Sequence, residues 1–170
     1  MLSIQSDAKP LILNVGCGWD RRENTVNIDL HDERADVKAD ALDLHMFEDG
    51  VADIVIASQL LEHFSRHDGE RALKEWFRVL RSGGECIVTT PDMEAVCSVF
   101  KEFPEEYRQS FMYMLFGWQN EDKPGMVHKW GFTPRGLAKA MEDSGFDVIW
   151  MDKNNPKRPT PSIRCIGRKP

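Results

Sequence analysis

The chain has 170 residues and a formal net charge of −6, a length that fits one domain and a charge that argues against general nucleic-acid binding. Hydrophobic residues make up 41% of it, which excludes the low hydrophobicity typical of disordered chains. Residues 1–10 lack a signal-peptide pattern, no apolar run approaches the about 20 residues of a membrane helix, and the four cysteines form no Cys-x-x-Cys pair. We therefore expect a cytoplasmic protein with neither a membrane nor a nucleic acid as partner.

Short apolar runs in the first third of the chain predict four strands, at residues 11–15, 26–29, 36–39 and 53–57. The first and the fourth are apolar on both faces, which is typical of strands buried in a parallel sheet. Residues 16–25 alone join the first two strands, and parallel strands usually need a connection of about a dozen residues or more. The sequence thus predicts a shortened first crossover.

Helical and extended patterns alternate in the rest of the chain. One apolar stripe predicts a helix over residues 66–81, with Ser65 as its cap and with Gly83 and Gly84 as its stop. A strand at 85–90 precedes a helical pattern over 92–116 that breaks at Pro104, and residues 117–132 are expected to form a loop. Thr133 begins a last helix that ends at Gly145, and the final strands are predicted at 146–151 and 162–168, separated by the stretch 152–161.

This alternation predicts an α/β protein with a Rossmann-like, doubly wound, mostly parallel sheet of seven strands. Helices are expected on both faces, in a three-layer αβα arrangement. The two closing strands follow each other without a helix, so we expect an antiparallel edge strand. We interpret residues 1–170 as a single domain in which the segment 92–132 covers the ligand.

Residues with ligand-binding chemistry follow the strands, at the edge where open α/β sheets bind ligands. Gly16 and Gly18 follow the first strand and let a ligand approach the backbone, and Asp29 ends the second strand with a carboxylate suited to a ribose diol. A dinucleotide site would need a third glycine and an acidic residue about 20 positions further on. The short crossover also leaves little room for the helix that stabilises a pyrophosphate, so the pattern favours S-adenosylmethionine over NAD or FAD.

Five segments, in this order, resemble class I S-adenosylmethionine-dependent methyltransferases: residues 12–18, 27–30, 39–44, 57–64 and 78–84. Residues 128–134 and 145–146 resemble one branch of these enzymes, the small methyltransferases of the type 11-like group. The resemblance covers nearly the whole chain, and it implies S-adenosylmethionine as the cofactor.

The resemblance also implies a role for each matching residue. Gly16, Cys17 and Gly18 would line the methionine side of the cofactor, and Ser58 and Gln59 would pass beneath it. The adenosine side would be held by Asp29 at the ribose, Leu30 against the adenine, Asp40 at the adenine amino group, and the backbone of Ala41 and Leu42. Asn14 stands where the family usually has an acidic residue, which removes one charge near the cofactor's ammonium group.

Methyl transfer is an in-line displacement in which the cofactor carries the difficult chemistry and the protein positions the reactants. His63 and His128 are the candidates for a catalytic base or for orienting the acceptor, although His63 could equally serve to pack or cap its helix. His31, His45 and His67 are expected at the surface. His63 and His67 are four residues apart, but because Ser65 begins a new helix between them, no metal site is expected.

The acceptor is less constrained by the sequence. Enzymes that methylate adenine or cytosine amino groups typically carry an Asn/Asp-Pro-Pro-aromatic run after the fourth strand, whereas residues 58–61 here are Ser-Gln-Leu-Leu. We therefore expect an oxygen or nitrogen nucleophile on a small-molecule or sugar-containing acceptor of the glycan type, with a homodimer as the possible assembly. Two alternatives remain: a non-catalytic cofactor-binding subunit or regulator that needs a partner, and a nicotinamide oxidoreductase.

Overall fold

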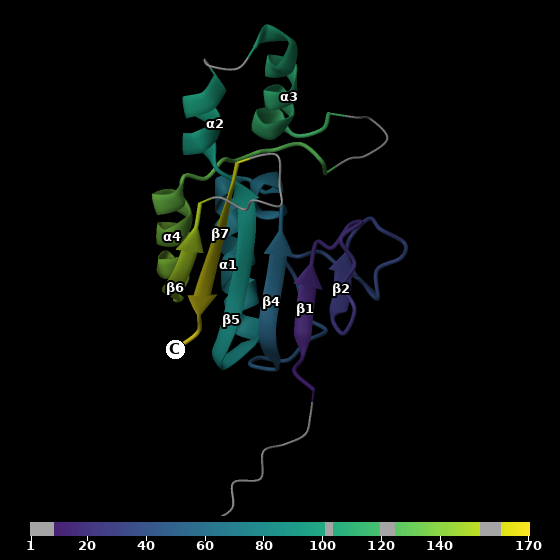
Figure 1. The fold of residues 1–170 in the computed structure, drawn as a ribbon. Helices are drawn as coiled ribbons and strands as arrows, with labels where there is room; N and C mark the ends of the chain where they lie inside the picture. The colour runs from purple at the N-terminus through teal and green to yellow at the C-terminus, as the bar shows by residue number, and fades with distance from the viewer. Residues whose placement is uncertain (1–8, 101–103, 120–124, 154–160) are drawn as a thin grey trace, which may run out of the picture.

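The structure is a computed structural model that describes residues 9–100, 104–119, 125–153 and 161–170. Its strands form one sheet in the order β3-β2-β1-β4-β5-β7-β6 (Figure 1). Their bounds are β1 (Ile12–Val15), β2 (Val26–Asp29), β3 (Val37–Lys38), β4 (Ala52–Ser58), β5 (Leu80–Pro91), β6 (Asp147–Asp152) and β7 (Ser162–Arg168). Strands β1 to β5 pair in parallel, and β7 runs antiparallel between β5 and β6. The predicted mostly parallel sheet with an antiparallel pair at one edge is confirmed.

The helices are the 3-10 turn η1 (Leu61–His63), α1 (Arg66–Val79), α2 (Met93–Phe100), α3 (Glu105–Phe116) and α4 (Pro134–Asp143). In Figure 1, α1 and α4 lie behind the sheet, whereas α2 and α3 lie beyond the carboxyl ends of its parallel strands. Both predicted caps are confirmed: Ser65 Oγ accepts from Asp68 N at 3.1 Å, and Thr133 Oγ1 accepts from Gly136 N at 3.1 Å. In the part of the chain that the structure describes, no helix is long and apolar enough to cross a membrane.

The end of α1 differs from the sequence prediction. The helix ends at Val79, and Leu80 is already extended and begins β5, so Gly83 and Gly84 lie within that strand. The pairing of β4 with β5 shifts register there, from Ala52 with Leu80 to Ile54 with Glu85. A Cβ on Gly84 would lie 3.0 Å from the carbonyl oxygen of Asp53, so the glycine pair serves the bulge instead of stopping the helix.

Side-chain hydrogen bonds hold the short first crossover to the sheet. Asn14 Nδ2 donates to Asp20 O at 2.8 Å and to Asn27 Oδ1 at 2.9 Å, and Asn27 Oδ1 also accepts from Arg22 N at 2.8 Å. Asp36 Oδ2 accepts from Asn27 N at 2.9 Å, which ties the next connection to the same strand. This hydrogen-bond network fixes residues 16–25 to the sheet, as a packed helix does in a longer crossover.

The hydrophobic core lies between one face of the sheet and the two helices behind it. Alternate residues of the strands face α1 and α4, and they are almost completely buried: Leu13, Val15, Val55, Ala57, Cys86, Val88, Ile163 and Cys165. Trp76 of α1 is 0% exposed among them, and its Nε1 donates to the carbonyl oxygen of Ala41 at 3.0 Å. This packing holds the connection from β3 to β4 against α1.

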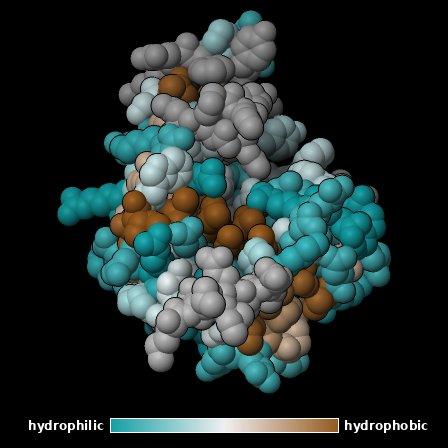
Figure 2. Space-filling model, turned by 60° about the horizontal axis from the view of Figure 1, so that its bottom comes forward, coloured by the Kyte–Doolittle hydropathy of each residue, from teal (hydrophilic) through white to brown (hydrophobic). Residues whose placement is uncertain are grey.

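The opposite face of the sheet carries the other alternate residues, and no helix of the described residues covers it. Five of them are half-buried isoleucines, namely Ile12, Ile54, Ile56, Ile87 and Ile166, which we call the isoleucine face. Figure 2 shows a hydrophobic band across the molecule in this region, with hydrophilic surface on either side. The expected third layer is therefore not seen in the described part of the chain.

The missing layer has a simple physical reason. Parallel crossovers are right-handed, and β1 leads to β2 and β3 in one direction while β4 leads to β5 in the other. Helices between β1, β2 and β3 would therefore lie on the face opposite α1. Residues 16–25 and 30–36 make those connections without a helix, so no helix in the described part of the chain covers that face.

Candidate active site

The turn after β1 exposes its backbone at the carboxyl edge of the sheet. Gly16 and Gly18 have φ angles of +63° and +45°, a region that favours glycine. Between them, Cys17 N donates to Ile28 O at 3.0 Å, which holds the turn against β2. A Cβ added to Gly18 would meet no atom within 4 Å, so the backbone there faces open space that a ligand can enter.

The carboxylate of Asp29 joins this turn to the one that follows β2. Its Oδ2 accepts from Gly18 N at 2.9 Å, while its Oδ1 accepts from His31 N at 2.8 Å and from Asp32 N at 2.9 Å. The structure thus brings Gly18 and Asp29 together, as the sequence predicted. The hold of Asp29 on a ribose stays a prediction, and a carboxylate that accepts three hydrogen bonds still has room for about one more.

The residues predicted for the adenine follow β2 and β3. Asp40 is exposed, and its Oδ1 accepts from Leu42 N at 2.9 Å, which leaves its other oxygen for a ligand. Leu30 is 45% exposed, an unusual position for a leucine and one that suits an aromatic ring. Ala41 is buried, and its carbonyl oxygen faces the indole of Trp76, so only the other side of its backbone is left for the adenine.

Ser58 ends β4, and Gln59 follows it with a φ angle of +55° and its N donating to Thr89 O at 2.7 Å. Two buried polar atoms near this edge have no hydrogen-bond partner among the described residues: Asn14 Oδ1, an acceptor, and Gln59 Nε2, a donor. The ammonium and the carboxylate of a methionine group would satisfy these atoms. With the open turn at Gly18, the residues present fit S-adenosylmethionine.

The thiol of Cys17 lies in the same turn. Burial and the nearby charge of Asp29 raise the pKa of Cys17 to about 11, so the thiol stays protonated at neutral pH. It can line a cofactor, and it is unsuited to act as a nucleophile.

The two histidines predicted for chemistry lie together. Their ring centroids are 4.9 Å apart with the planes at 74°. His63 comes from η1, and His128 comes from the segment after α3, where His128 N donates to Phe116 O at 3.0 Å and Val127 bridges to Gly117. The structure therefore brings His63 and His128 into one cluster at the carboxyl edge. Residues 101–103 and 120–124 of the predicted cover 92–132 lie outside the described residues.

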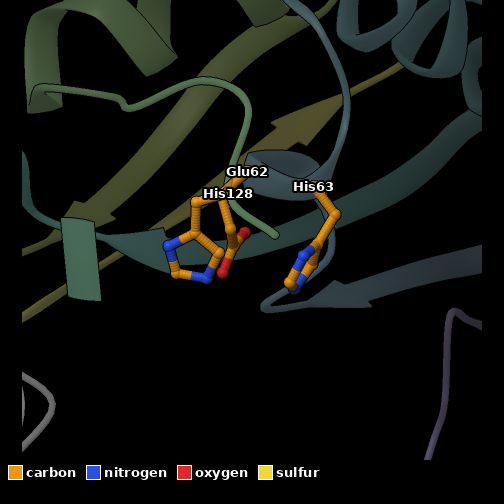
Figure 3. A group of neighbouring side chains, drawn as sticks. All are labelled: Glu62, His63 and His128. Atoms are coloured by element: carbon orange, nitrogen blue, oxygen red, sulfur yellow. The ribbon is translucent and has the colours of Figure 1, made fainter. Parts of the chain in front are cut away.

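Glu62 belongs to this cluster, and the sequence analysis missed it. The residue is 1% exposed, and Figure 3 shows its carboxylate beside the two imidazole rings. Its carbonyl oxygen accepts from Lys129 N at 2.8 Å and from Trp130 N at 3.2 Å, which fixes the loop after His128 against η1. One feature of the sequence could have indicated its role: Glu62 is a carboxylate that directly precedes His63 and directly follows two leucines, so it lies in an apolar stretch.

Burial, together with the nearby His128, lowers the pKa of His63 to about 4. Burial also lowers the pKa of His128. In both cases a charged imidazole would lose its hydration, so burial favours the neutral ring. His31, His45 and His67 are exposed, as predicted.

We expect Gly16→Val to abolish cofactor binding. A Cβ at this position would lie 2.5 Å from Leu60 Cδ1, and a branched residue is strained at this positive φ, so the turn must move. Gly18→Ala is the companion variant, because its Cβ meets no protein atom and instead enters the space assigned to the ligand. Thermal unfolding and a calorimetric titration with S-adenosylhomocysteine measure both effects. Two folded variants with wild-type affinity would mean that the loop is only a turn.

Comparison with known proteins agrees with the fold. Residues 13–88 match the family model described as a methyltransferase domain. No curated protein matches the sequence. Among solved structures, a S-adenosylmethionine-dependent methyltransferase from Methanosarcina mazei has a TM-score of 0.66 at 16% identity, covering 94% of this chain and 92% of its own.

Two further structures share the fold. The 1,6-didemethyltoxoflavin-N1-methyltransferase of Burkholderia thailandensis, solved with 1,6-didemethyltoxoflavin and S-adenosylhomocysteine, has a TM-score of 0.63 at 13% identity, covering 94% of this chain and 71% of its own. A putative methyltransferase in complex with the Trm112 methyltransferase activator of Haloferax volcanii has a TM-score of 0.57 at 14% identity, covering 95% of this chain and 83% of the other.

Proposed function

We propose that this chain is a class I S-adenosylmethionine-dependent methyltransferase and that it methylates an oxygen or nitrogen of a small-molecule or sugar-containing acceptor, a proposal supported by the family match over residues 13–88 and by the fold. One observation carries the proposal. The open turn at Gly18 with Asp29, which suits the cofactor, and the cluster of His63 and His128, which suits an acceptor, follow strands of the same sheet at its carboxyl edge.

S-adenosylmethionine, when bound, supplies an electrophilic methyl group on its sulfonium. Asp29 would accept one further hydrogen bond, from the ribose, and Asp40 would accept one from the adenine amino group with Leu30 against the ring. Asn14 Oδ1 and Gln59 Nε2, which lack partners among the described residues, hold the methionine ammonium and carboxylate. Gly16, Cys17, Gly18 and Ser58 surround the methionine chain and fix the direction of the methyl group.

His63 and His128 orient the acceptor, and one of them takes its proton. Each imidazole is neutral at pH 7, since burial lowers the pKa of both side chains, and a neutral ring can accept a hydrogen bond from a hydroxyl or amine. Helices α2 and α3 lie beyond the same edge of the sheet, which supports a cover built from the segment 92–132 (Figure 1). The Burkholderia structure, solved with 1,6-didemethyltoxoflavin, supports a small-molecule acceptor.

Calorimetric titration with S-adenosylhomocysteine, followed by an acceptor screen that measures S-adenosylhomocysteine release, tests the proposal. Binding at one site and turnover with the chain alone are expected. The Haloferax complex favours a second possibility, in which the chain needs a protein partner before it turns over. Binding without turnover for any acceptor would support that possibility, and absence of binding would refute both.

We also infer that the chain forms a homodimer through the isoleucine face. The central row, Ile56, Ile87 and Ile166, is uncharged and apolar, and two such faces can pack about 10 Å apart as in other paired sheets. Glu85 and Arg168 form an ion pair at 2.8 Å on the neighbouring row and can re-pair across a two-fold axis.

The four free cysteines suit a reducing compartment, so we propose the cytoplasm as the location of the protein.

Light scattering after gel filtration should give twice the chain mass for the wild type and the monomer mass for Ile87→Glu. The added charge would be buried unpaired between two copies, whereas in the monomer it stays accessible to water. Met46→Glu is the control, because Met46 is exposed in the connection that packs against α1. A monomeric wild type would contradict the inference.

A further inference from the structure

Glu62, His63 and His128 converge on one point. Each offers one ligand atom, and the three atoms all lie within 4.8 Å of one another. Figure 3 shows the carboxylate from η1 and the two rings converging, one ring from the same turn and the other from the loop after α3. Two imidazoles and one carboxylate form a donor set that binds divalent transition metals in many proteins.

The hydrogen bonds of the two rings leave the correct nitrogen for such an ion. His63 Nδ1 lies 3.2 Å from Val127 O, and His128 Nδ1 lies 2.9 Å from Met114 O. A carbonyl oxygen can only accept, so Nδ1 of each ring carries the hydrogen and Nε2 presents its lone pair. Metal-binding histidines are usually oriented by this kind of bond from the other ring nitrogen.

The backbone around the three residues is tightly held. Glu62 O accepts from two successive amides, those of Lys129 and Trp130, and His128 N donates to Phe116 O at 3.0 Å. A Cβ on Gly117 would lie 2.1 Å from Met126 O and 2.6 Å from His128 N, so the two segments touch at a position where only glycine fits. The backbone that carries the donor groups is therefore fixed before any ligand arrives.

We propose that Glu62, His63 and His128 bind a divalent transition-metal ion with two nitrogen donors and one oxygen donor. With bonds of about 2.1 Å, two ligands of a tetrahedral ion lie about 3.4 Å apart, so binding draws the side chains together by about an ångström. The site revises the expectation of no metal, which considered only the pairing of His63 with His67.

Three protein ligands leave at least one coordination position open. An ion here would bind an acceptor oxygen and lower the pKa of its hydroxyl, whose proton would pass to water, and the two histidines would then serve as ligands of the ion instead of as proton acceptors. This role rests on the proposed methyl transfer, whereas metal binding itself does not. The inference thus narrows the acceptor class to hydroxyl compounds.

Titration of the metal-free, cofactor-free protein with Co²⁺ tests the site directly. We expect one ion per chain, visible d–d absorption without thiolate charge-transfer bands, and a dissociation constant below about 10 µM. Zn²⁺ should displace Co²⁺, in keeping with the usual order of affinities at such sites, and a competitive titration measures this. A wild-type protein that binds neither ion in this range overturns the proposal.

Variants locate the ion. Glu62→Gln, His63→Ala and His128→Ala should each weaken Co²⁺ binding by about 100-fold or more, because the two alanines remove a ligand and the glutamine removes the negative charge of the third. His67→Ala is the matched control: it removes an exposed histidine just four residues from His63 and should leave the affinity unchanged. An equal loss of Co²⁺ affinity in the control, or wild-type Co²⁺ affinity in all three variants, would place the ion elsewhere and refute the proposed site.

Two further measurements keep the outcomes separate. Circular dichroism checks folding, and His128→Gln replaces His128→Ala if the smaller side chain unfolds the chain. Titration of the same metal-free protein with S-adenosylhomocysteine tests the methyltransferase function independently. Cobalt binding without S-adenosylhomocysteine binding would refute the function and keep the metal site, and the reverse result would refute the metal site alone.

Discussion

Alanine in place of His63 or His128 is expected to lower turnover by at least about 100-fold in one of the two variants, once an acceptor is in hand. Both rings lie at the carboxyl edge of the sheet, 4.9 Å apart, where the methyl group should project. Neither ring is assigned to the adenosine, so affinity for S-adenosylhomocysteine should stay within about 1 kcal/mol of wild type. Steady-state kinetics and calorimetry on each variant measure the two quantities.

His67→Ala serves again as the control, and it should retain wild-type turnover. Loss of cofactor binding in His63→Ala or His128→Ala would show that the methyl-facing side has been misplaced. Full turnover in both would mean that catalysis depends on proximity alone and that the two histidines are structural.

Asp29→Ala should weaken S-adenosylhomocysteine binding by about 1.5–3 kcal/mol, since it removes a charged hydrogen-bond acceptor. That free energy corresponds to an increase of about 10- to 150-fold in the dissociation constant. The structure adds a second reason, because Asp29 also accepts from Gly18 N, His31 N and Asp32 N. The turns after β1 and β2 should therefore lose their fixed relation in this variant.

Calorimetry measures the affinity, and thermal unfolding separates a local loss from a global one. Asp29→Asn keeps an acceptor oxygen without the charge, and it should fall between wild type and alanine. Asp43→Ala is the control, because it removes an exposed carboxylate from the connection after β3 and should leave the affinity for S-adenosylhomocysteine unchanged. Wild-type affinity for S-adenosylhomocysteine in a folded Asp29→Ala variant would refute the assignment of Asp29 to the ribose site.

Features that depend on neighbours in the sequence could be predicted without a structure. Strand β2 at residues 26–29, the caps at Ser65 and Thr133 and the turn at Gly16 and Gly18 all match the structure, because alternation, capping and positive φ angles are local properties. The meeting of Gly18 with Asp29 also followed, since parallel strands end at a common edge.

Features that depend on packing could not be predicted from the sequence. Val79 ends α1 because Leu80 pairs with Ala52 of β4, a contact to which the local helical period of residues 66–81 gives no clue. Among the described residues, no helix covers the isoleucine face because of crossover handedness and the length of two connections, although the first and fourth predicted strands are apolar on both faces.

The cluster at the carboxyl edge is the clearest case. The sequence by itself determined that His63 follows a strand and that His128 lies in a later segment able to reach it. Their contact, the position of the Glu62 carboxylate beside them and the lowered pKa of His63 arise only when η1 packs against the chain after α3. Burial and the direction of a side chain are set by atoms distant in sequence, so these properties of the site belong to the tertiary structure.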